Sequence, residues 1–441
     1  MTNSAQSRSF RRFQGTFLLL ALPLLVAAIA TQAANAQTIT VLHTFTGGGD
    51  GDEPTTGLAI DQAGNLYGTT SSGGAGFGNV FQVRRAGTGW ILNPLHEFTS
   101  GHDGAGPAGR PVFGPDGALY GTTVFGGGTA CGVGCGIVYR LSPPPTACTG
   151  ATCPWVEKVL YSFTGSPDGA FPAGPLSFDS AGNIYGTTQN GGTNGQGTVF
   201  ELMPSNGSWT ESVLYSFSGG ADGAQPFGGV ALDSAGNLLG TAFSGGLGNG
   251  TIFMLQAMNG SWIESTLHMF TGSDDGASPV GGLLSAGADT FYGTTTNQGA
   301  HCPVHTIDTG TCVGAGTAFQ FTYSTSGTSY SVIYEFPFGG DLNAGPQDSL
   351  SMDAAGNLYG TARLNGLQNT GSVFKLTFNG QTWTGTLLYS FNYFGPDGSY
   401  PYSNIVMDAS GMLYGTAQAG GSGNCIFPSG GCGTVYQIRG R

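Results

Sequence analysis

Short runs of alternating apolar and polar residues recur along most of the chain, separated by turns rich in Gly, Asn and Asp. Alternation with a period of two over about 4–8 residues is typical of half-buried β-strands. One stretch shows four such runs in succession: "GGVALD" (228–233), "NLLGTA" (237–242), "GTIFMLQ" (250–256) and "SWIESTLHMF" (261–270). The pattern predicts a unit of four strands, which we name a, b, c and d in chain order.

The second strand of this unit carries a motif that divides the chain into repeats. It reads "AGNLYGTT" at 63–70, "AGNIYGTT" at 181–188 and "AGNLYGTA" at 355–362. Its tyrosine position falls at Tyr67, Tyr120, Tyr185, Leu239, Tyr292, Tyr359 and Tyr414, with spacings of 53 to 67 residues. Seven copies at this spacing indicate one supersecondary unit repeated along the chain.

The two ends of the repeated region complement each other. Residues 38–45, "TITVLHTF", resemble strand d without a, b or c before it, and residues 433–438, "GTVYQI", resemble strand c without d after it. Pairing these ends would close a ring and remove an unpaired strand edge. The sequence therefore predicts an all-β fold: residues 37–441 form a single seven-bladed β-propeller of four-stranded blades, closed by the N-terminal strand.

The unit "GNLYGTT…GG…GTVF" resembles the repeat of the GloVer-type (Gloeo-Verruco) tandem-repeat proteins, which are exported bacterial proteins. The resemblance covers residues 37–441 and implies a β-propeller-like repeat protein, but it implies no particular activity. The sequence ends at Arg441 without a sorting or anchoring tail. We therefore expect release or noncovalent retention at the cell surface.

Residues 1–36 have the pattern of a secretory signal peptide. Arg8, Arg11 and Arg12 precede an apolar run at 17–30, and an Ala-Asn-Ala cleavage site follows at 34–36. The apolar run is shorter than the roughly 20 residues that a spanning helix needs. We expect a secreted or periplasmic protein that has no membrane association after cleavage.

Charge limits the partners of the mature chain. Removing three Arg with residues 1–36 leaves nine basic residues of the 12 against 25 acidic ones, a net charge near −16. Such a charge disfavours nucleic acid and anionic lipid as partners. We expect a monomer whose partner is an extracellular polysaccharide or protein.

Residues that recur in every repeat are interpreted as scaffold. Aspartates in the a-to-b connection precede Gly and are turn formers; they are Asp61, Asp179, Asp233, Asp353 and Asp408. Aromatic residues at the start of strand d are expected to pack at the blade rim; they are Trp90, Trp155, Trp209, Trp262 and Trp383, with Tyr330 placed at the matching position. One strand-d position alternates between His (His43, His96, His268) and Tyr (Tyr161, Tyr215, Tyr334, Tyr389), which indicates hydrogen bonding.

The d-to-a connection reads Asp-Gly-x-x-Pro in six repeats, at Asp50, Asp103, Asp168, Asp222, Asp275 and Asp397. Two interpretations stay open: a turn-forming aspartate, or a ring of carboxylates that binds a ligand at the channel mouth, with His102 beside Asp103. Acids cluster further at Asp50, Asp52 and Glu53, which makes these three residues the candidate metal ligands, with calcium as the candidate cofactor.

Eight cysteines fall into four local pairs: Cys131 with Cys135, Cys148 with Cys153, Cys302 with Cys312, and Cys425 with Cys432. In an exported chain they predict disulfides within single loops. A zinc site at His301, Cys302 and His305 is the alternative for the third loop, and the two histidines are also candidate ligand-binding residues.

No nucleophile elbow, phosphate-binding loop, HExxH motif or paired catalytic carboxylates stand out from the repeats. This absence favours a non-catalytic binding or structural module for an extracellular polysaccharide or protein. The alternative is a propeller enzyme of lactonase, lyase or glycosidase type, with acids at the channel mouth.

Overall fold

A computed structural model describes residues 37–144, 154–287, 289–297, 316–324, 327–337, 345–363, 370–392, 395–423, 425 and 431–439. The chain divides into residues 1–36 and 37–441, so the signal-peptide prediction lies outside the described residues. Strands are the regular elements of the described part, which contains no helix and therefore no helix long and apolar enough to cross a membrane.

The strands form seven antiparallel sheets, each in the order a, b, c, d. Blade 1 holds β2 (Ala59–Ile60), β3 (Leu66–Thr70), β4 (Asn79–Ala86) and β5 (Gly89–Glu97). In blade 2, strand a is split into β6 (Ala105–Pro107) and β7 (Val112–Phe113), followed by β8 (Leu119–Phe125), β9 (Ile137–Ser142) and β10 (Val156–Ser162). Blade 3 holds β11 (Ala170–Phe178), β12 (Ile184–Asn190), β13 (Thr198–Ser205) and β14 (Ser208–Ser216).

The remaining blades follow the same order. Blade 4 holds β15 (Val230–Leu232), β16 (Leu238–Ala242), β17 (Thr251–Met258) and β18 (Ser261–Met269). Blade 5 holds β19 (Leu284–Ser285), β20 (Thr290–Thr295), β21 (Thr317–Ser324) and β22 (Gly327–Glu335). Blade 6 holds β23 (Ser351–Met352), β24 (Leu358–Ala362), β25 (Ser372–Phe378) and β26 (Trp383–Ser390). Blade 7 holds β27 (Val406–Met407), β28 (Met412–Ala417) and β29 (Thr434–Arg439), with β1 (Ile39–Thr44) as its fourth strand.

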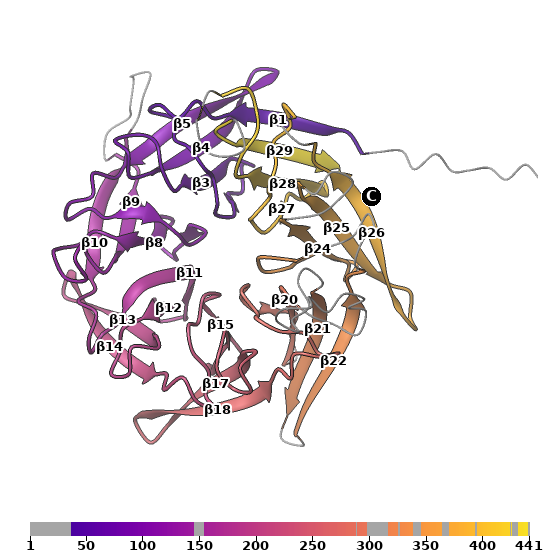
Figure 1. Cartoon of the computed structure of the whole chain (residues 1–441). Coiled ribbons are helices and arrows are strands. Elements are labelled where there is room, and N and C mark those ends of the chain that lie inside the picture. Colours follow the sequence, from indigo (N-terminus) through magenta and orange to yellow (C-terminus); the bar gives the residue numbers. More distant parts are fainter. Residues whose placement is uncertain are drawn as a thin grey trace, which may run out of the picture. The chain divides into compact units, whose positions relative to one another are not determined.

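The seven sheets surround a central axis, as Figure 1 shows, and the predicted β-propeller is confirmed. The ring closes through β1 and β29, which pair antiparallel with Ile39 opposite Ile438 and Thr44 opposite Thr434. The N-terminal strand thus occupies the place that strand d fills in the other blades, as the sequence predicted. Closure leaves β29 without an exposed backbone edge.

The motif of strand b is explained by the contacts of its residues. In blade 1, all five residues of β3 are buried. Gly68 has no space for a side chain, since a Cβ there would lie 2.5 Å from Cζ of Phe81 on strand c. The hydroxyl of Tyr67 donates to Oδ2 of Asp61 at 3.1 Å, and Oδ1 of Asp61 accepts the backbone N–H groups of Ala63 and Asn65. The predicted role of Asp61 in the turn is confirmed.

The motif threonine links neighbouring blades. In blade 4, Thr241 donates to the carbonyl of Gly281 in blade 5 at 3.0 Å. The same bond recurs three more times around the ring, and the last one spans the closure. The pairs are Thr294 with Asp348 (3.2 Å), Thr361 with Ser403 (2.7 Å) and Thr416 with Thr56 (3.0 Å).

The hydrophobic core lies between the blades. Each strand-d tryptophan with a described ring contact packs against the motif tyrosine of the preceding blade, which confirms the predicted aromatic packing. The centroid distances are 5.9 Å for Trp155–Tyr67, 6.0 Å for Trp90–Tyr414, 6.3 Å for Trp262–Tyr185 and 5.8 Å for Trp383–Tyr292.

The placement of Tyr330 at the tryptophan position was wrong. Tyr330 pairs with Phe321, which is equivalent to Leu255 of blade 4, and the partner of Leu255 is Glu264. The tryptophan of blade 4, Trp262, pairs instead with Ala257, so Tyr330 stands at the position of Glu264. Its ring stacks on His268 at 4.1 Å, and its hydroxyl donates to the carbonyl of Asp275.

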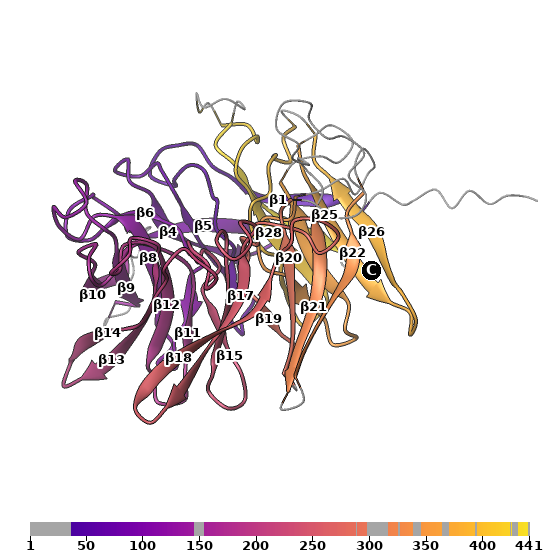
Figure 2. The same ribbon diagram turned by 60° about the horizontal axis from the view of Figure 1, so that its bottom comes forward.

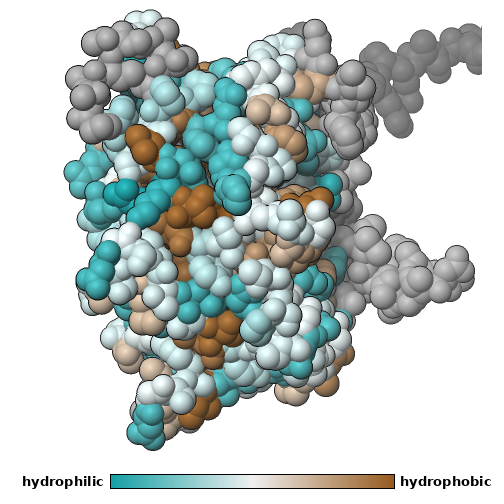
Figure 3. Space-filling view, turned by 90° about the vertical axis from the view of Figure 1, so that its left-hand side faces the viewer, coloured by the Kyte–Doolittle hydropathy of each residue, from teal (hydrophilic) through white to brown (hydrophobic). Residues whose placement is uncertain are grey.

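The two faces of the ring differ. The c-to-d hairpins, such as β13–β14, project to one face in Figure 2. The b-to-c and d-to-a connections lie together at the other, joined by bridges such as Asp52–Ser72 and Ala224–Ser244. On the outer wall, Figure 3 shows hydrophobic residues in separate patches among polar ones. We call the face with the b-to-c and d-to-a connections the loop face.

Candidate functional site

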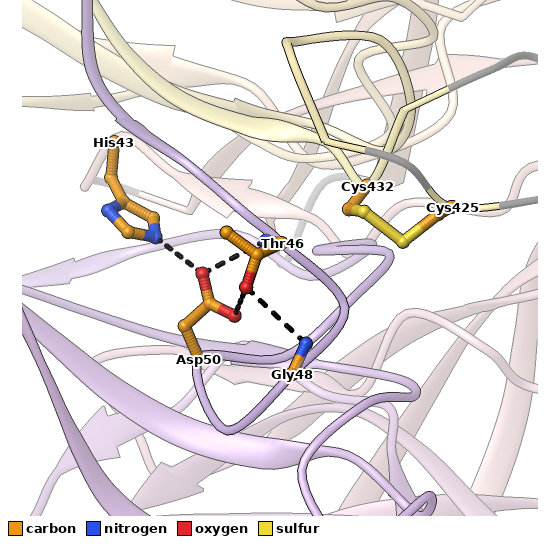
Figure 4. Close-up of a disulfide and its surroundings, with 6 residues drawn as sticks. All are labelled: His43, Thr46, Gly48, Asp50, Cys425 and Cys432. Atoms are coloured by element: carbon orange, nitrogen blue, oxygen red, sulfur yellow. Dashed lines mark hydrogen bonds and ion pairs between the residues drawn. A yellow bond between two sulfur atoms is a disulfide. The ribbon is translucent and has the colours of Figure 1, made fainter.

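The aspartate of the Asp-Gly-x-x-Pro turn is held by its own loop and by strand d. In the first repeat, Oδ2 of Asp50 lies 3.0 Å from Nε2 of His43 and accepts the backbone N–H of Thr46. Figure 4 shows the imidazole and the threonine hydroxyl both directed at this carboxylate. Five other repeats bring the same two positions together; the side chains are hydrogen-bonded in four of them, whereas Nε2 of His96 has no hydrogen-bond partner among the described residues. The distances are 3.7 Å for His96–Asp103, 2.7 Å for Tyr161–Asp168, 3.0 Å for Tyr215–Asp222, 3.1 Å for His268–Asp275 and 2.6 Å for Tyr389–Asp397.

The proline of the turn packs against a glycine of the preceding blade. Pro279 of blade 5 sits on Gly250 of blade 4, where a Cβ would lie 2.7 Å from Cδ of the proline. The residue before the proline, Ser278, has φ of 57° and donates its backbone N–H to the carbonyl of Asn249. Comparable contacts join every pair of neighbours. The proline–glycine pairs are Pro54–Gly433, Pro107–Gly78, Pro172–Gly136, Pro226–Gly197, Pro346–Gly316 and Pro401–Gly371.

These contacts bear on the predicted acidic ring. The described carboxylates face their own turns, and Asp168, Asp222 and Asp397 are buried. His102 is exposed beside Asp103. Ligand binding by the turn aspartates and His102 stays a prediction, while His301 and His305 lie outside the described residues.

The three candidate metal ligands do not converge. Asp50 is bonded within its turn, and Glu53 accepts the hydroxyl of Ser71 at 3.3 Å. Oδ1 of Asp52 is buried without a hydrogen-bond partner, and burial together with repulsion from Glu53 raises the pKa of Asp52 to about 6. Within the described part of the chain, the one group of three potential metal ligands whose atoms all lie within 4.8 Å of one another is Asp52 with Cys425 and Cys432. Those sulfurs are joined in a disulfide, so calcium binding here stays a prediction.

Two of the four predicted disulfides lie in the described part, and both are confirmed: Cys131–Cys135 and Cys425–Cys432. Each disulfide lies in a loop whose backbone carbonyl accepts a hydrogen bond from the next blade. The carbonyl of Cys135 accepts the N–H of Phe171, and that of Cys432 accepts the N–H of Glu53. The pairs Cys148–Cys153 and Cys302–Cys312, and the zinc alternative, fall outside the described residues.

A cavity of about 570 Å³ occupies the channel at the loop face. Its wall is formed mainly by the residues one to three places after each turn proline, together with the ends of strands b. In most blades these places hold small or apolar residues such as Ala108, Gly174 and Gly228. Polar side chains that break this pattern gather in the same wall; they are Arg110, Gln347, Asp348, Tyr402 and Asn404, joined by Gln189 from the end of strand b.

Arg110 and Asn404 occupy equivalent places, three residues after Pro107 and Pro401. They flank Gly57 of blade 1, where a Cβ would overlap Oδ1 of Asn404 and lie 3.3 Å from Cδ of Arg110. Both also line a second cavity of about 170 Å³ further along the channel, so they stand where the two cavities meet. Gly57 therefore leaves the space in which the two long side chains approach each other.

The polar groups of this wall are largely unpaired with protein. Among the described residues, the side chains of Arg110, Gln189, Gln347 and Asn404 form no hydrogen bond, and Oδ1 of Asn404 is buried. Asp348 differs, because Oδ1 accepts the N–H of Ser349 at 2.6 Å and Oδ2 accepts the N–H of Asn404 at 2.9 Å. We call Arg110, Gln189, Gln347 and Asn404 the channel polar set.

Charge in the cavity is balanced by one group of each sign. Burial lowers the pKa of the Arg110 guanidinium, and the Asp348 carboxylate opposes that shift. Burial raises the pKa of Asp348, against its two backbone hydrogen bonds and the charge of Arg110. The two side chains influence each other without forming an ion pair, since none joins them at 4.0 Å or less.

Sequence reasoning missed the channel polar set. The signal was available, because aligning the seven repeats on the turn proline puts Arg110 and Asn404 in a column that otherwise holds Gly57, Pro175, Gly229, Gly282 and Ser349. A residue that breaks a repeat is a functional candidate, and the sequence-based prediction considered tryptophan, histidine, cysteine and acidic residues but not arginine or asparagine.

No curated protein matches this chain. Among solved structures, the PQQ-bound aldose sugar dehydrogenase of Streptomyces coelicolor is similar at 13% identity, with a TM-score of 0.42 over 91% of this chain and 98% of that chain. A hypothetical selenium-binding protein from Sulfolobus tokodaii is similar at 11% identity, with a TM-score of 0.47 over 73% of this chain and 74% of that one. Similarity at this level carries no argument about activity.

A family model also matches the chain, and it covers residues 95–307. The matched span begins in strand β5 of blade 1 and continues through blades 2, 3 and 4 into blade 5. Its description is the Gloeobacter/Verrucomicrobia repeat, the family whose repeat the motifs of this chain resemble. Over these residues, the chain matches the model of the Gloeobacter/Verrucomicrobia repeat family.

Proposed function

We propose that this protein is an exported, non-catalytic binding module that holds part of an extracellular polysaccharide in the loop-face cavity of its channel. One observation carries the proposal: the channel polar set converges on a single cavity and leaves its hydrogen-bonding groups unpaired within the described protein. Buried polar groups are normally paired, so the buried Oδ1 of Asn404, left unpaired beside the cavity, indicates a ligand or ordered water.

The rest of the lining suits a sugar. Four aromatic rings, Phe77, Phe125, Phe227 and Tyr402, line the cavity beside the polar groups. Phe77 and Phe125 are 39% and 41% exposed, so their faces are accessible. Apolar and aromatic walls with a few placed polar groups are typical of small-ligand pockets, which hold roughly 300–1,000 Å³. A saccharide offers both hydroxyls for the polar set and apolar ring faces for the aromatic residues.

The chemistry of the lining favours binding over catalysis. Asp348 is the one carboxylic acid among the described lining residues, and the lining contains no histidine or cysteine. Both oxygens of Asp348 already accept backbone N–H groups. Glycoside hydrolysis generally needs two carboxyl groups flanking the bond, and acyl transfer needs a nucleophile beside a base.

The two disulfides support a location outside the cytoplasm, because disulfides persist in oxidising compartments. Together with the signal-peptide pattern of residues 1–36, they support export to the periplasm or the extracellular space. In that location, polysaccharides are accessible to an acidic propeller that carries these disulfides.

Filling the cavity tests the proposal. Thr55 and Ala108 stand one residue after their turn prolines, where Phe227 and Tyr402 already show that an aromatic residue is tolerated. The double variant Thr55→Tyr, Ala108→Tyr should abolish binding of soluble polysaccharides that the wild-type protein retains in affinity electrophoresis and calorimetry. Ser205→Tyr, in the hairpin of the opposite face, is the matched control and should bind normally. Release of new reducing ends or opened lactones by the wild-type protein would contradict a non-catalytic role.

A further inference from the structure

We propose that the cavity recognises a carboxylated sugar, and that Arg110 binds the carboxylate while Asn404 binds a neighbouring hydroxyl. This inference rests on the proposed function and names its ligand class. It depends on the chemistry of two adjacent side chains that the fold holds open toward the cavity.

The first argument is the hydrogen-bonding capacity of Arg110. A guanidinium carries five N–H donors in a planar fork, and a carboxylate matches two of them at once. Among the described residues, no acceptor hydrogen-bonds these donors. The side chain is partly exposed to the channel, so the donors are accessible to a ligand. A carboxylate group of the ligand supplies the missing planar acceptor.

Asp348 does not take the place of that ligand. Its two oxygens accept backbone N–H groups at 2.6 and 2.9 Å, and it forms no ion pair with Arg110. Its negative charge balances that of Arg110, so the guanidinium is not an isolated charge in the cavity wall. The carboxylate of Asp348 is thus oriented by the backbone, and the fork of Arg110 stays free for a second carboxylate.

Asn404 adds a requirement for a hydroxyl. Its amide forms no hydrogen bond among the described residues, and Oδ1 is buried without a partner. Oδ1 can accept a hydrogen bond from a hydroxyl but not from a carboxylate, because Oδ1 and an ionised carboxylate are both acceptors with no proton to donate. The pair Arg110 and Asn404, brought together over Gly57, therefore fits a carboxylate and a hydroxyl on one small ring, which is the arrangement in a uronic acid.

A second cation strengthens the preference for an anion. Arg363 stacks over the ring of Tyr402 with its Cζ 4.4 Å from the centroid, and its Nε is buried without a hydrogen-bond partner among the described residues. Tyr402 lines the cavity, and Arg363 contacts its ring without being one of the lining residues. In a sequence with 25 acidic residues against 12 basic ones, the cavity wall holds one cation, Arg110, and one carboxylate, Asp348, and a second cation, Arg363, contacts its Tyr402.

The experiment compares matched sugars on the purified wild-type propeller. Calorimetry is carried out with D-galacturonate, D-glucuronate, D-mannuronate and L-guluronate, each beside its neutral parent hexose, and with galactose 6-phosphate. We expect at least one uronate to bind ten-fold or more tightly than its parent, with an affinity that falls as salt rises. Arg110→Gln should remove that ten-fold preference, so that the uronate binds no more tightly than its parent hexose.

Controls separate the outcomes. Arg140→Gln removes a cation that pairs with Asp116 away from the cavity, and it should leave the uronate preference intact. An unchanged melting temperature for Arg110→Gln shows that the variant is folded. Equal binding of uronate and parent hexose, unaffected by Arg110→Gln, would overturn the carboxylate inference but keep the proposed function. Tighter binding of galactose 6-phosphate than of any uronate would also overturn it. Binding of no saccharide, whether monomer or polymer, would overturn the proposed function itself.

Discussion

At the scale of single residues, the turn aspartate joins strand d to the loop that follows it. Asp275 receives the backbone N–H of Thr271 at 2.9 Å and lies 3.1 Å from Nε2 of His268 on strand d. One carboxylate therefore fixes both the exit from strand d and the shape of the loop toward strand a. A charged acceptor with several donors contributes more than a neutral hydrogen bond.

Asp275→Asn tests this role. We expect a loss of about 1–3 kcal/mol in the free energy of unfolding, because the amide keeps one acceptor and turns a donor toward Thr271 or His268. Asp274→Asn, at the exposed preceding position, is the matched control and should change stability little. Equal melting temperatures for the two variants in chemical and thermal denaturation would contradict the structural role of Asp275.

A second residue-scale feature is the contact between glycine and proline of adjacent blades. Gly250 and Gly248 have similar φ values of 95° and 98°, so alanine is strained at both. They differ in space, since a Cβ on Gly248 meets nothing within 4 Å, whereas on Gly250 it would lie 2.7 Å from Pro279 and 2.5 Å from the carbonyl oxygen of Ala242. Gly250→Ala should therefore cost about 1–3 kcal/mol more than Gly248→Ala in urea denaturation.

Pro279→Ala provides the second half of this comparison. It removes the Cδ atom on which the Gly250 contact depends, so part of the Gly250→Ala penalty should disappear in the double variant. The clash with Ala242 remains and limits the recovery. Strict additivity of the two substitutions would show that the blades do not meet through this pair.

At the scale of elements, strand d places a carboxyl group between neighbouring blades. Oε1 of Glu157 on β10 and of Glu211 on β14 are buried without a hydrogen-bond partner. Burial, with the added repulsion of Asp103 and Asp168, raises the pKa of each glutamate to about 7. The folded protein thus holds protons on these two groups that an unfolded chain would release near pH 4.5.

Stability should consequently fall between pH 5 and pH 8. A carboxyl group whose pKa is raised by folding contributes its full stabilisation below the unfolded value and loses it as the pH rises through the folded value. We expect a melting temperature several degrees lower at pH 8 than at pH 5. The double variant Glu157→Gln, Glu211→Gln should flatten this profile, whereas Glu97→Gln, at an exposed position of β5, should keep it. A wild-type profile that rises over this range would refute the assignment.

The elements themselves were readable from the sequence wherever a repeat fixes their register. The Tyr67 motif, the Asp61 turn and the closing strand at Val41 follow from local patterns that appear several times. Tyr330 was misplaced because aromatic type was used as the guide. In the structure, its position follows from the register counted back from Phe336, and a stacking contact with His268 of the previous blade explains why a tyrosine stands there.

At the scale of the whole molecule, the channel site was not predictable from local pattern. Gly57 and Arg110 are one repeat apart, but Asn404 follows Gly57 by 404 − 57 = 347 residues, and the closed ring brings the three together. The acidic turns were conspicuous in the sequence, but their carboxylates are engaged by strand d in the described blades. Repetition therefore reveals the scaffold, while the site depends on substitutions at otherwise small positions that the ring gathers at its centre.

The closed ring also predicts that the chain ends can be moved to another blade without a change of fold. Strands β29 and β1 pair with Ile438 opposite Ile39, which is the geometry of the c-to-d hairpins in the other blades. Joining Arg441 directly to Gln37 would leave a four-residue connection, a length common in β-hairpins. New ends can be opened between Asn206 and Gly207, in the turn that joins β13 to β14.

This permuted chain should fold to the same propeller, because blade 3 would then be closed by strand pairing as blade 7 is in the natural order. We expect a far-ultraviolet circular dichroism spectrum equal to that of the natural chain and a melting temperature within a few degrees of it. Deleting residues 37–46 from the natural chain is the contrasting control, since it removes β1 and exposes the edge of β29. That deletion should cause a large loss of stability and aggregation, whereas trimming residues 440 and 441 should not. A permuted chain as unstable as the deletion would show that the order of the blades, and not closure of the ring, determines the fold.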